Sequence, residues 1–149
     1  MDEDEEVAAA MEEAKTPGRS GRRREVYHSW PPAAAALIVE WRARWPAAFT
    51  KPVPLAVGFS GHIKAALRAE EKPMDRKEVS RTIRLWTWQS AYLRAVARGE
   101  MRRNLDGSEA GLPDDASRQE AQRALDERAA RHAARAERER ERKLAAAQA

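Results

Sequence analysis

The segment from Asp75 to Gly99 constrains the fold more than any other, because both of its ends are marked in the sequence. Asp75 and Glu78 have the spacing of a capping box, Met74 and Val79 that of a hydrophobic staple, and Gly99 suits a helix C-terminal cap. The side chains expected on the buried stripe between these ends are Val79, Ile83, Trp86, Ser90, Leu93 and Val96. We therefore expect one helix here, with basic stripes beside its core stripe.

Two shorter helices are expected before this segment. Pro31-Pro32 favours a helix start, and Leu37, Trp41 and Trp45 recur at four-residue spacing before Pro46 ends the pattern. A second helix is predicted to have Ser60 as its N-cap and to bury the apolar side chains that follow. The residues expected on that buried side are Ile63, Ala66 and Leu67.

A turn and a long helix follow Gly99. Asp106-Gly107 is typical of a type I′ turn, which predicts a small β-hairpin over 101–112. A helix is then expected from Asp114 or Asp115 to about Ala147, mostly exposed because nearly all its apolar residues are alanine. Its expected ion pairs at i,i+4 are Asp114 with Arg118, Glu127 with Arg131, and Glu139 with Lys143.

The sequence divides into three regions. Residues 1–31 are interpreted as a disordered arm, because acidic and basic blocks with little apolar content cannot bury enough surface to fold. Residues 32–112 are predicted to form a compact domain, and 113–149 a charged helical extension. The expected fold class is mainly α with a small β-hairpin (α+β).

The positive charge is concentrated in the middle of the chain. The whole protein has a net charge of +4, whereas residues 40–107 hold fourteen basic and seven acidic side chains, a net charge of +7. Four of the five tryptophans lie in this same stretch. The predicted core and the positive charge therefore occupy the same 68 residues.

Composition and motifs argue against several classes of function. The chain has no cysteine and three scattered histidines, so no metal site, cofactor or thiol nucleophile is expected. Phosphate loops, zinc-protease motifs and catalytic triads are also missing, so we expect neither an enzyme nor a small-molecule substrate. Because no apolar run could span a bilayer and the start is acidic, we expect a soluble, cytoplasmic protein that does not contact membranes.

Four motifs in order resemble the ProQ/FinO family of bacterial RNA chaperones. They are Trp45-Pro46 with Phe49, Pro54 to Gly58, Ile83 to Thr87 followed by Tyr92-Leu93, and Arg102 to Gly107. The resemblance covers about half the chain, from Leu37 to Leu112. It implies a compact helical domain that binds structured RNA, particularly terminator hairpins with a single-stranded 3′ tail. The implied partners are small RNAs and mRNA 3′ ends, the implied process is post-transcriptional regulation, and a monomer is expected.

The same resemblance implies a binding site. A pocket for the RNA 3′ end would be lined by Thr87, Tyr92 and Arg102. The RNA backbone would be contacted by a larger set: Lys51, Ser60, Gly61, Lys64, Arg76, Arg81, Arg84 and Arg103. Ala56 and Ser80 stand where many members have basic residues, so Lys51, Lys64 and Arg103 are expected to compensate.

The residues also leave other interpretations open. Tyr92 could pack in the core, and Thr87 could bond a backbone carbonyl of its own helix. Trp88 is either a packing surface against the C-terminal helix or a platform for base stacking. At the level of function, the alternatives are a protein-interaction scaffold that uses the exposed C-terminal helix, and a non-specific nucleic-acid binder.

Overall fold

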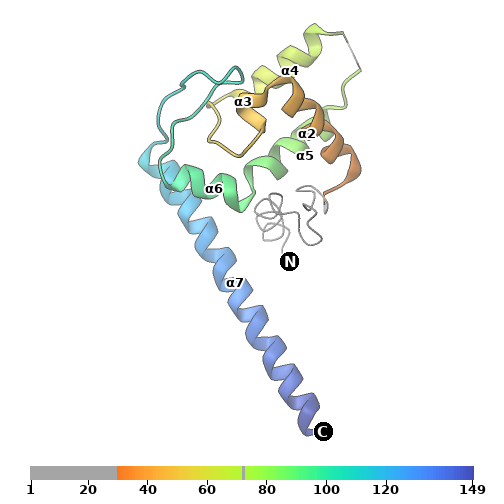
Figure 1. Cartoon of the computed structure of the whole chain (residues 1–149), viewed down its shortest axis with the longest axis vertical. Helices are drawn as coiled ribbons and strands as arrows, with labels where there is room; N and C mark the ends of the chain where they lie inside the picture. The colour runs from red at the N-terminus through yellow and green to blue at the C-terminus, as the bar shows by residue number, and fades with distance from the viewer. Residues whose placement is uncertain (1–29, 72) are drawn as a thin grey trace.

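The computed structural model describes residues 30–71 and 73–149, and this part of the chain is mainly helical (Figure 1). Its helices are α2 (Pro32–Arg44), α3 (Pro46–Phe49), α4 (Phe59–Ala69), α5 (Arg76–Thr87), α6 (Ser90–Ala97) and α7 (Asp115–Gln148). Residues 1–29, which hold most of the predicted arm, lie outside the described residues. No helix in the described part is both long enough and apolar enough to cross a membrane.

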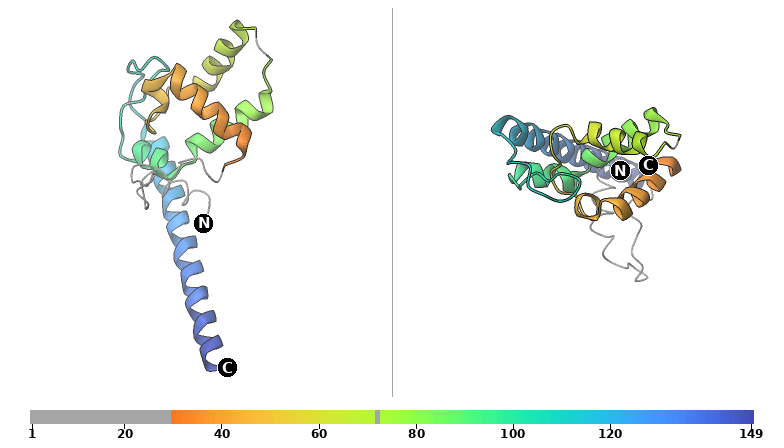
Figure 2. Two further views of the ribbon diagram at one scale, coloured as in Figure 1. Left: turned by 45° about the vertical axis from the view of Figure 1, so that its right-hand side comes forward. Right: turned by 90° about the horizontal axis from the view of Figure 1, so that it is seen from above.

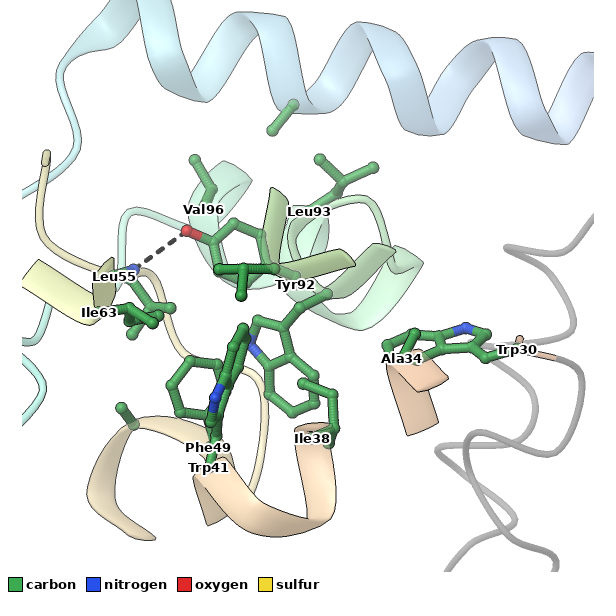
Figure 3. Close-up of a cluster of buried hydrophobic side chains, with 14 of the residues drawn as sticks. Trp30, Ala34, Ile38, Trp41, Phe49, Leu55, Ile63, Tyr92, Leu93 and Val96 are labelled. Atoms are coloured by element: carbon green, nitrogen blue, oxygen red, sulfur yellow. Dashed lines mark hydrogen bonds between the residues drawn. The ribbon is translucent and has the colours of Figure 1, made fainter. Parts of the chain in front are cut away.

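A cluster of aromatic side chains forms the centre of the core. Trp41, Phe49 and Trp86 are fully buried; the ring centroids of Trp41 and Phe49 lie 5.5 Å apart, and those of Phe49 and Trp86 5.2 Å apart. Figure 3 shows Ile38 beside this cluster, with Trp30 and Ala34 further toward the start of α2. These contacts join α2, α3 and α5 into one unit.

The buried face of α2 differs from the predicted one. Ala34, Ile38 and Trp41 are buried, whereas Leu37 and Trp45 lie at its half-exposed edge. The four-residue spacing of Leu37, Trp41 and Trp45 drifts around the helix by about 40° at each step, so only its middle member can face the core centre. Trp30 is also buried, although the sequence placed it in the arm.

The single helix predicted from Asp75 to Gly99 is two helices. Asp75 caps α5 as expected, accepting from the backbone N–H groups of Lys77 and Glu78. The chain breaks at Gln89, whose ψ of 144° is extended and whose side-chain amide donates to the carbonyl of Trp86 at 2.9 Å. The prediction of one continuous helix was therefore wrong.

Gly99 ends α6 as predicted. Its φ of 78° is left-handed, its N–H donates to the Val96 carbonyl, and the Glu100 N–H donates to the Ala95 carbonyl. This pair of bonds is a Schellman motif.

The N-terminus of α4 was predicted incorrectly. The N-cap is Gly58, with a φ of 90°, and no side chain caps the helix. Ser60 instead lies inside the first turn. A glycine can take this left-handed conformation without steric cost, which lets the helix start two residues earlier than a serine cap would.

The segment 101–112 folds back on itself but does not form the predicted strands. Arg103 forms isolated bridges with Leu55 and Glu109, and the described residues contain no extended ladder. The turn also differs from type I′, because Asp106 has negative φ and only Gly107, at 91°, is left-handed. A Cβ at Gly107 would lie 2.7 Å from Cβ of Ala47, so glycine is also required for close contact with α3.

The helix α7 begins where the sequence predicted, with Asp114 accepting from the N–H of Ser117 at 2.8 Å. Its first half packs against α6, burying Ala121 and Ala124, and its second half extends away from the other helices (Figures 1 and 2). The ion pairs recorded along it are at i,i+3, for example Arg123 with Glu120, rather than at the predicted i,i+4 spacing. Glu139 accordingly pairs with Arg142 and not with Lys143.

Candidate nucleic-acid interface

One face of α5, together with Lys64 of α4, gathers positive charge at the surface. Val79, Thr82 and Trp86 turn the opposite side of α5 into the core, against α2, so the charged residues between them point outward. A shallow depression runs along this outward side and is lined by Arg76, Lys77, Ser80, Arg81 and Arg84. We call Lys64, Arg76, Lys77, Arg81 and Arg84 the basic face.

Lys64 is tied to this face by a specific contact. Its Nζ donates to Oγ of Ser80 at 3.1 Å, which joins α4 to α5. The only ion pair recorded on the basic face, within the described residues, joins Arg81 and Glu78 at 3.6 Å. The face therefore keeps a positive charge available to an anionic partner.

Tyr92 and Arg102 meet on the backbone of Leu55, and we call these three residues the Tyr92 cluster. The Leu55 N–H donates to the Tyr92 hydroxyl at 3.1 Å, as Figure 3 shows, and Nη1 of Arg102 donates to the Leu55 carbonyl at 2.9 Å. The structure thus brings together two of the three residues predicted for the 3′-end pocket. The core interpretation of Tyr92 is also correct, since the side chain is only 7% exposed.

The Tyr92 cluster favours a neutral phenol. Burial raises the pKa of Tyr92, and the hydrogen bond from Leu55 and the positive charge of Arg102 oppose this only in part. The hydroxyl accepts from Leu55 and keeps its own proton as a donor.

Thr87, the third predicted pocket residue, bonds within its own helix. Its Oγ1 donates to the carbonyl of Ile83 at 3.0 Å, which is the local role that the sequence had left open. The described residues show no hydrogen bond from Thr87 to Tyr92 or Arg102. Its oxygen lone pairs remain able to accept a hydrogen bond.

The remaining predicted contacts lie on other elements. Ser60 and Gly61 lie in the first turn of α4, and the Gly61 N–H already donates to the Gly58 carbonyl at 3.0 Å. Lys51 is exposed after α3, and Arg103 donates from Nη1 to the Gly107 carbonyl at 3.3 Å. No recorded contact among the described residues links Lys51 or Arg103 to the basic face.

One contact was missed by the sequence analysis. Arg128 of α7 is 5% exposed; its guanidinium lies 4.7 Å from the ring centroid of Trp88, and Nη1 donates to Oγ of Ser90 at 2.9 Å. Trp88 therefore packs against the C-terminal helix, one of the two roles considered, while remaining 48% exposed. The signal was present, because Arg128 follows Ala121 and Ala124 at helical spacing and shares their buried face.

Comparison with known proteins agrees with this architecture. The profile of the ProQ/FINO family matches residues 32–138. Among solved structures, the chain resembles NMB1681 from Neisseria meningitidis MC58, described as a FinO-like RNA chaperone, with a TM-score of 0.52 and 23% identity over 61% of this chain and 92% of that one. A search of curated proteins finds no match. Because the family profile covers more than half of the sequence, the chain belongs to the ProQ/FinO family.

Proposed function

We propose that this protein binds the 3′ ends of structured RNAs, especially terminator hairpins with a single-stranded tail, and acts through small RNAs in post-transcriptional regulation. RNA binding of the chaperone type follows from its membership in the ProQ/FinO family, and it agrees with the expectation of a binding protein rather than an enzyme. The hairpin and tail specificity is the part that needs testing.

The observation that carries the proposal is the basic face. Its five cations lie on two packed helices, and one carboxylate, that of Glu78, offsets them at 3.6 Å. A-form RNA has a major groove too narrow for side chains, so a stem is held through phosphates and 2′-hydroxyls. Exposed arginine and lysine side chains along a shallow depression suit that kind of contact.

The Tyr92 cluster supports recognition of the RNA end. One guanidinium nitrogen of Arg102 is used on the Leu55 carbonyl, which leaves other donors for a terminal phosphate. Tyr92 can donate its hydroxyl proton, and Thr87 can accept from a ribose hydroxyl. In this proposal the side chains of Thr87, Tyr92 and Arg102 bind a free 3′-terminus. Tyr92 and Arg102 are both hydrogen-bonded to the backbone of Leu55.

The first experiment compares three RNAs in a gel-shift or fluorescence anisotropy titration. One is a terminator hairpin with its 3′ tail intact, the second has a shortened tail, and the third carries a 3′-phosphate. We expect the intact tail to bind most tightly. Equal affinity for all three would contradict end recognition, while leaving binding to the stem unaffected.

Salt and competitor controls separate the alternatives. If RNA is held through its phosphates, rising salt should weaken binding, with a slope of log affinity against log salt concentration of about −0.7 to −0.9 per phosphate contact. A packed protein interface responds far less to salt. Duplex DNA should compete poorly, because it lacks the 2′-hydroxyl. Full competition by DNA would favour the non-specific binder.

A further inference from the structure

The contact between Trp88 and Arg128 joins two charged surfaces that are distant in sequence. Trp88 ends α5, which carries most of the basic face, and Arg128 lies in the middle of α7. The guanidinium lies 4.7 Å from the indole centroid, and the Arg128 side chain is anchored on Ser90. The two helices therefore meet at a fixed point.

On α5, part of the basic face has the same orientation as Trp88. At 3.6 residues per turn, Lys77, Arg81, Arg84 and Trp88 fall within about 40° of a common direction. All four side chains are exposed. They form a stripe about 16 Å long that ends at Trp88.

On α7, arginines continue the face that packs against the domain. Arg128 follows the buried Ala121 and Ala124, and beyond it the same face is occupied by Arg131, Arg135 and Arg138, all within about 40° of a common direction. This second stripe is about 15 Å long. Within the part of the chain that the structure describes, no ion pair is recorded for Arg131, Arg135 or Arg138.

The two stripes meet at a single contact, because each contains the residue by which its helix reaches the other. From that contact each stripe continues along its own helix. We propose that an RNA stem lies along both stripes, so that α7 forms a second basic wall of the binding site rather than an inert extension. This inference rests on the proposed RNA-binding function.

The composition of the α7 stripe favours this occupant over a second copy of the chain. A coiled-coil seam needs apolar residues at this 3-4 spacing, and arginines there would repel their counterparts in a dimer. Guanidinium groups bind phosphates with paired, charge-assisted hydrogen bonds. An RNA stem presents a continuous row of phosphates to such a stripe.

The test compares two triple variants of the full chain with equal loss of charge. The first is Arg131→Ala, Arg135→Ala and Arg138→Ala. The second is Arg123→Ala, Arg140→Ala and Lys143→Ala, whose side chains point about 100° or more away from the stripe. Alanine favours helix, so both variants should keep α7 folded, which circular dichroism checks.

Each variant is titrated with hairpins that share one loop and one 3′ tail but have a short or a long stem. We expect the stripe variant to bind the long stem about tenfold more weakly and to lose about two units of salt slope, with little change on the short stem. The off-stripe variant should resemble the unmodified protein. Equal effects of the two variants, or no effect of the stripe variant on the long stem, would overturn the proposal.

The outcomes also separate this proposal from the function on which it rests. If the unmodified protein prefers an intact 3′ tail but the stripe variant binds long stems normally, the proposed function stands and the second wall does not. If the unmodified protein binds neither hairpin, both fail. Unchanged RNA affinity of the stripe variant for both hairpins would leave the stripe to a protein partner and overturn the RNA proposal.

Discussion

The Tyr92 cluster and the basic face use polar side chains in opposite ways. Tyr92 and Arg102 are bonded to the backbone of Leu55 and help to hold the fold, whereas Arg81 and Arg84 are exposed and contribute little to it. Under the proposed function, the first region couples RNA binding to the stability of the fold, and the second separates the two. Substitutions in the two regions should therefore differ in kind as well as in size.

The largest effect is expected for Tyr92→Ala. Removing a buried aromatic ring leaves a cavity and an unpaired Leu55 N–H, so the free energy of unfolding should fall by about 3–5 kcal/mol. Urea denaturation followed by tryptophan fluorescence measures this. Tyr92→Phe keeps the ring and removes only the hydroxyl, so it should lose about 1–3 kcal/mol. A stable Tyr92→Ala would show that the residue is not part of the core.

Arg102→Ala should reduce both the stability of the fold and the preference for an intact RNA 3′ tail, with an effect of intermediate size. The Leu55 carbonyl loses a charged donor, at a cost of about 1.5–3 kcal/mol in unfolding free energy. Preference for the intact RNA 3′ tail should disappear in the same variant. Thermal melts and the three-RNA titration report these effects separately, and retained tail preference would remove Arg102 from the pocket.

The double variant Arg81→Ala and Arg84→Ala should act on binding alone. Its unfolding free energy should stay within about 0.5 kcal/mol of the original, because both side chains are exposed. Affinity for hairpins should fall about tenfold, with or without a 3′ tail. Arg123→Ala with Arg140→Ala is the matched control. A double variant that melts early would show that the basic face also has a structural role.

Thr87→Val should give a smaller effect. The methyl group preserves the shape, and the lost bond to the Ile83 carbonyl is one that helices tolerate. We expect nearly unchanged stability and a reduced distinction between a free 3′-hydroxyl and a 3′-phosphate. An unchanged distinction would confine Thr87 to its role within α5.

The smallest effect concerns alkaline pH. Because burial raises the folded pKa of Tyr92, its stabilising contribution is complete below the unfolded pKa of about 10 and is lost as pH rises through the folded value. The unfolding free energy is measured at a pH below the unfolded pKa of Tyr92 and at a pH above its folded pKa. Between these two pH values it should fall more for the unmodified protein than for Tyr92→Phe. Parallel curves would contradict this assignment.

Some features written in short stretches of sequence were predicted well, although the equally local Ser60 cap of α4 was wrong. The caps at Asp75, Asp114 and Gly99 depend on neighbouring residues, and all three are observed. The family motifs likewise identified Tyr92 and Arg102, which the structure brings together. Local chemistry was enough for these features.

Features that depend on distant partners were not predicted. The break at Gln89 accompanies a bond between Ser90 and Arg128, 38 residues further along the chain. Helical periodicity from Val79 to Val96 gives no sign of that partner. The segment 101–112 was likewise assigned strands from its turn residues, while its actual pairing runs partly to Leu55, outside the predicted hairpin.

The Leu55 peptide group has a consequence for the dynamics of the molecule. Its N–H is bonded to a residue 37 positions away and its carbonyl to one 47 positions away, so neither bond can open by fraying of a local element. Release of this amide proton to solvent requires the loop before α4 to separate from α6, and the bond from Arg102 to the Leu55 carbonyl opposes that movement. Leu55 should therefore be among the slowest amides to exchange with deuterium, and its exchange rate would report the global opening of the domain.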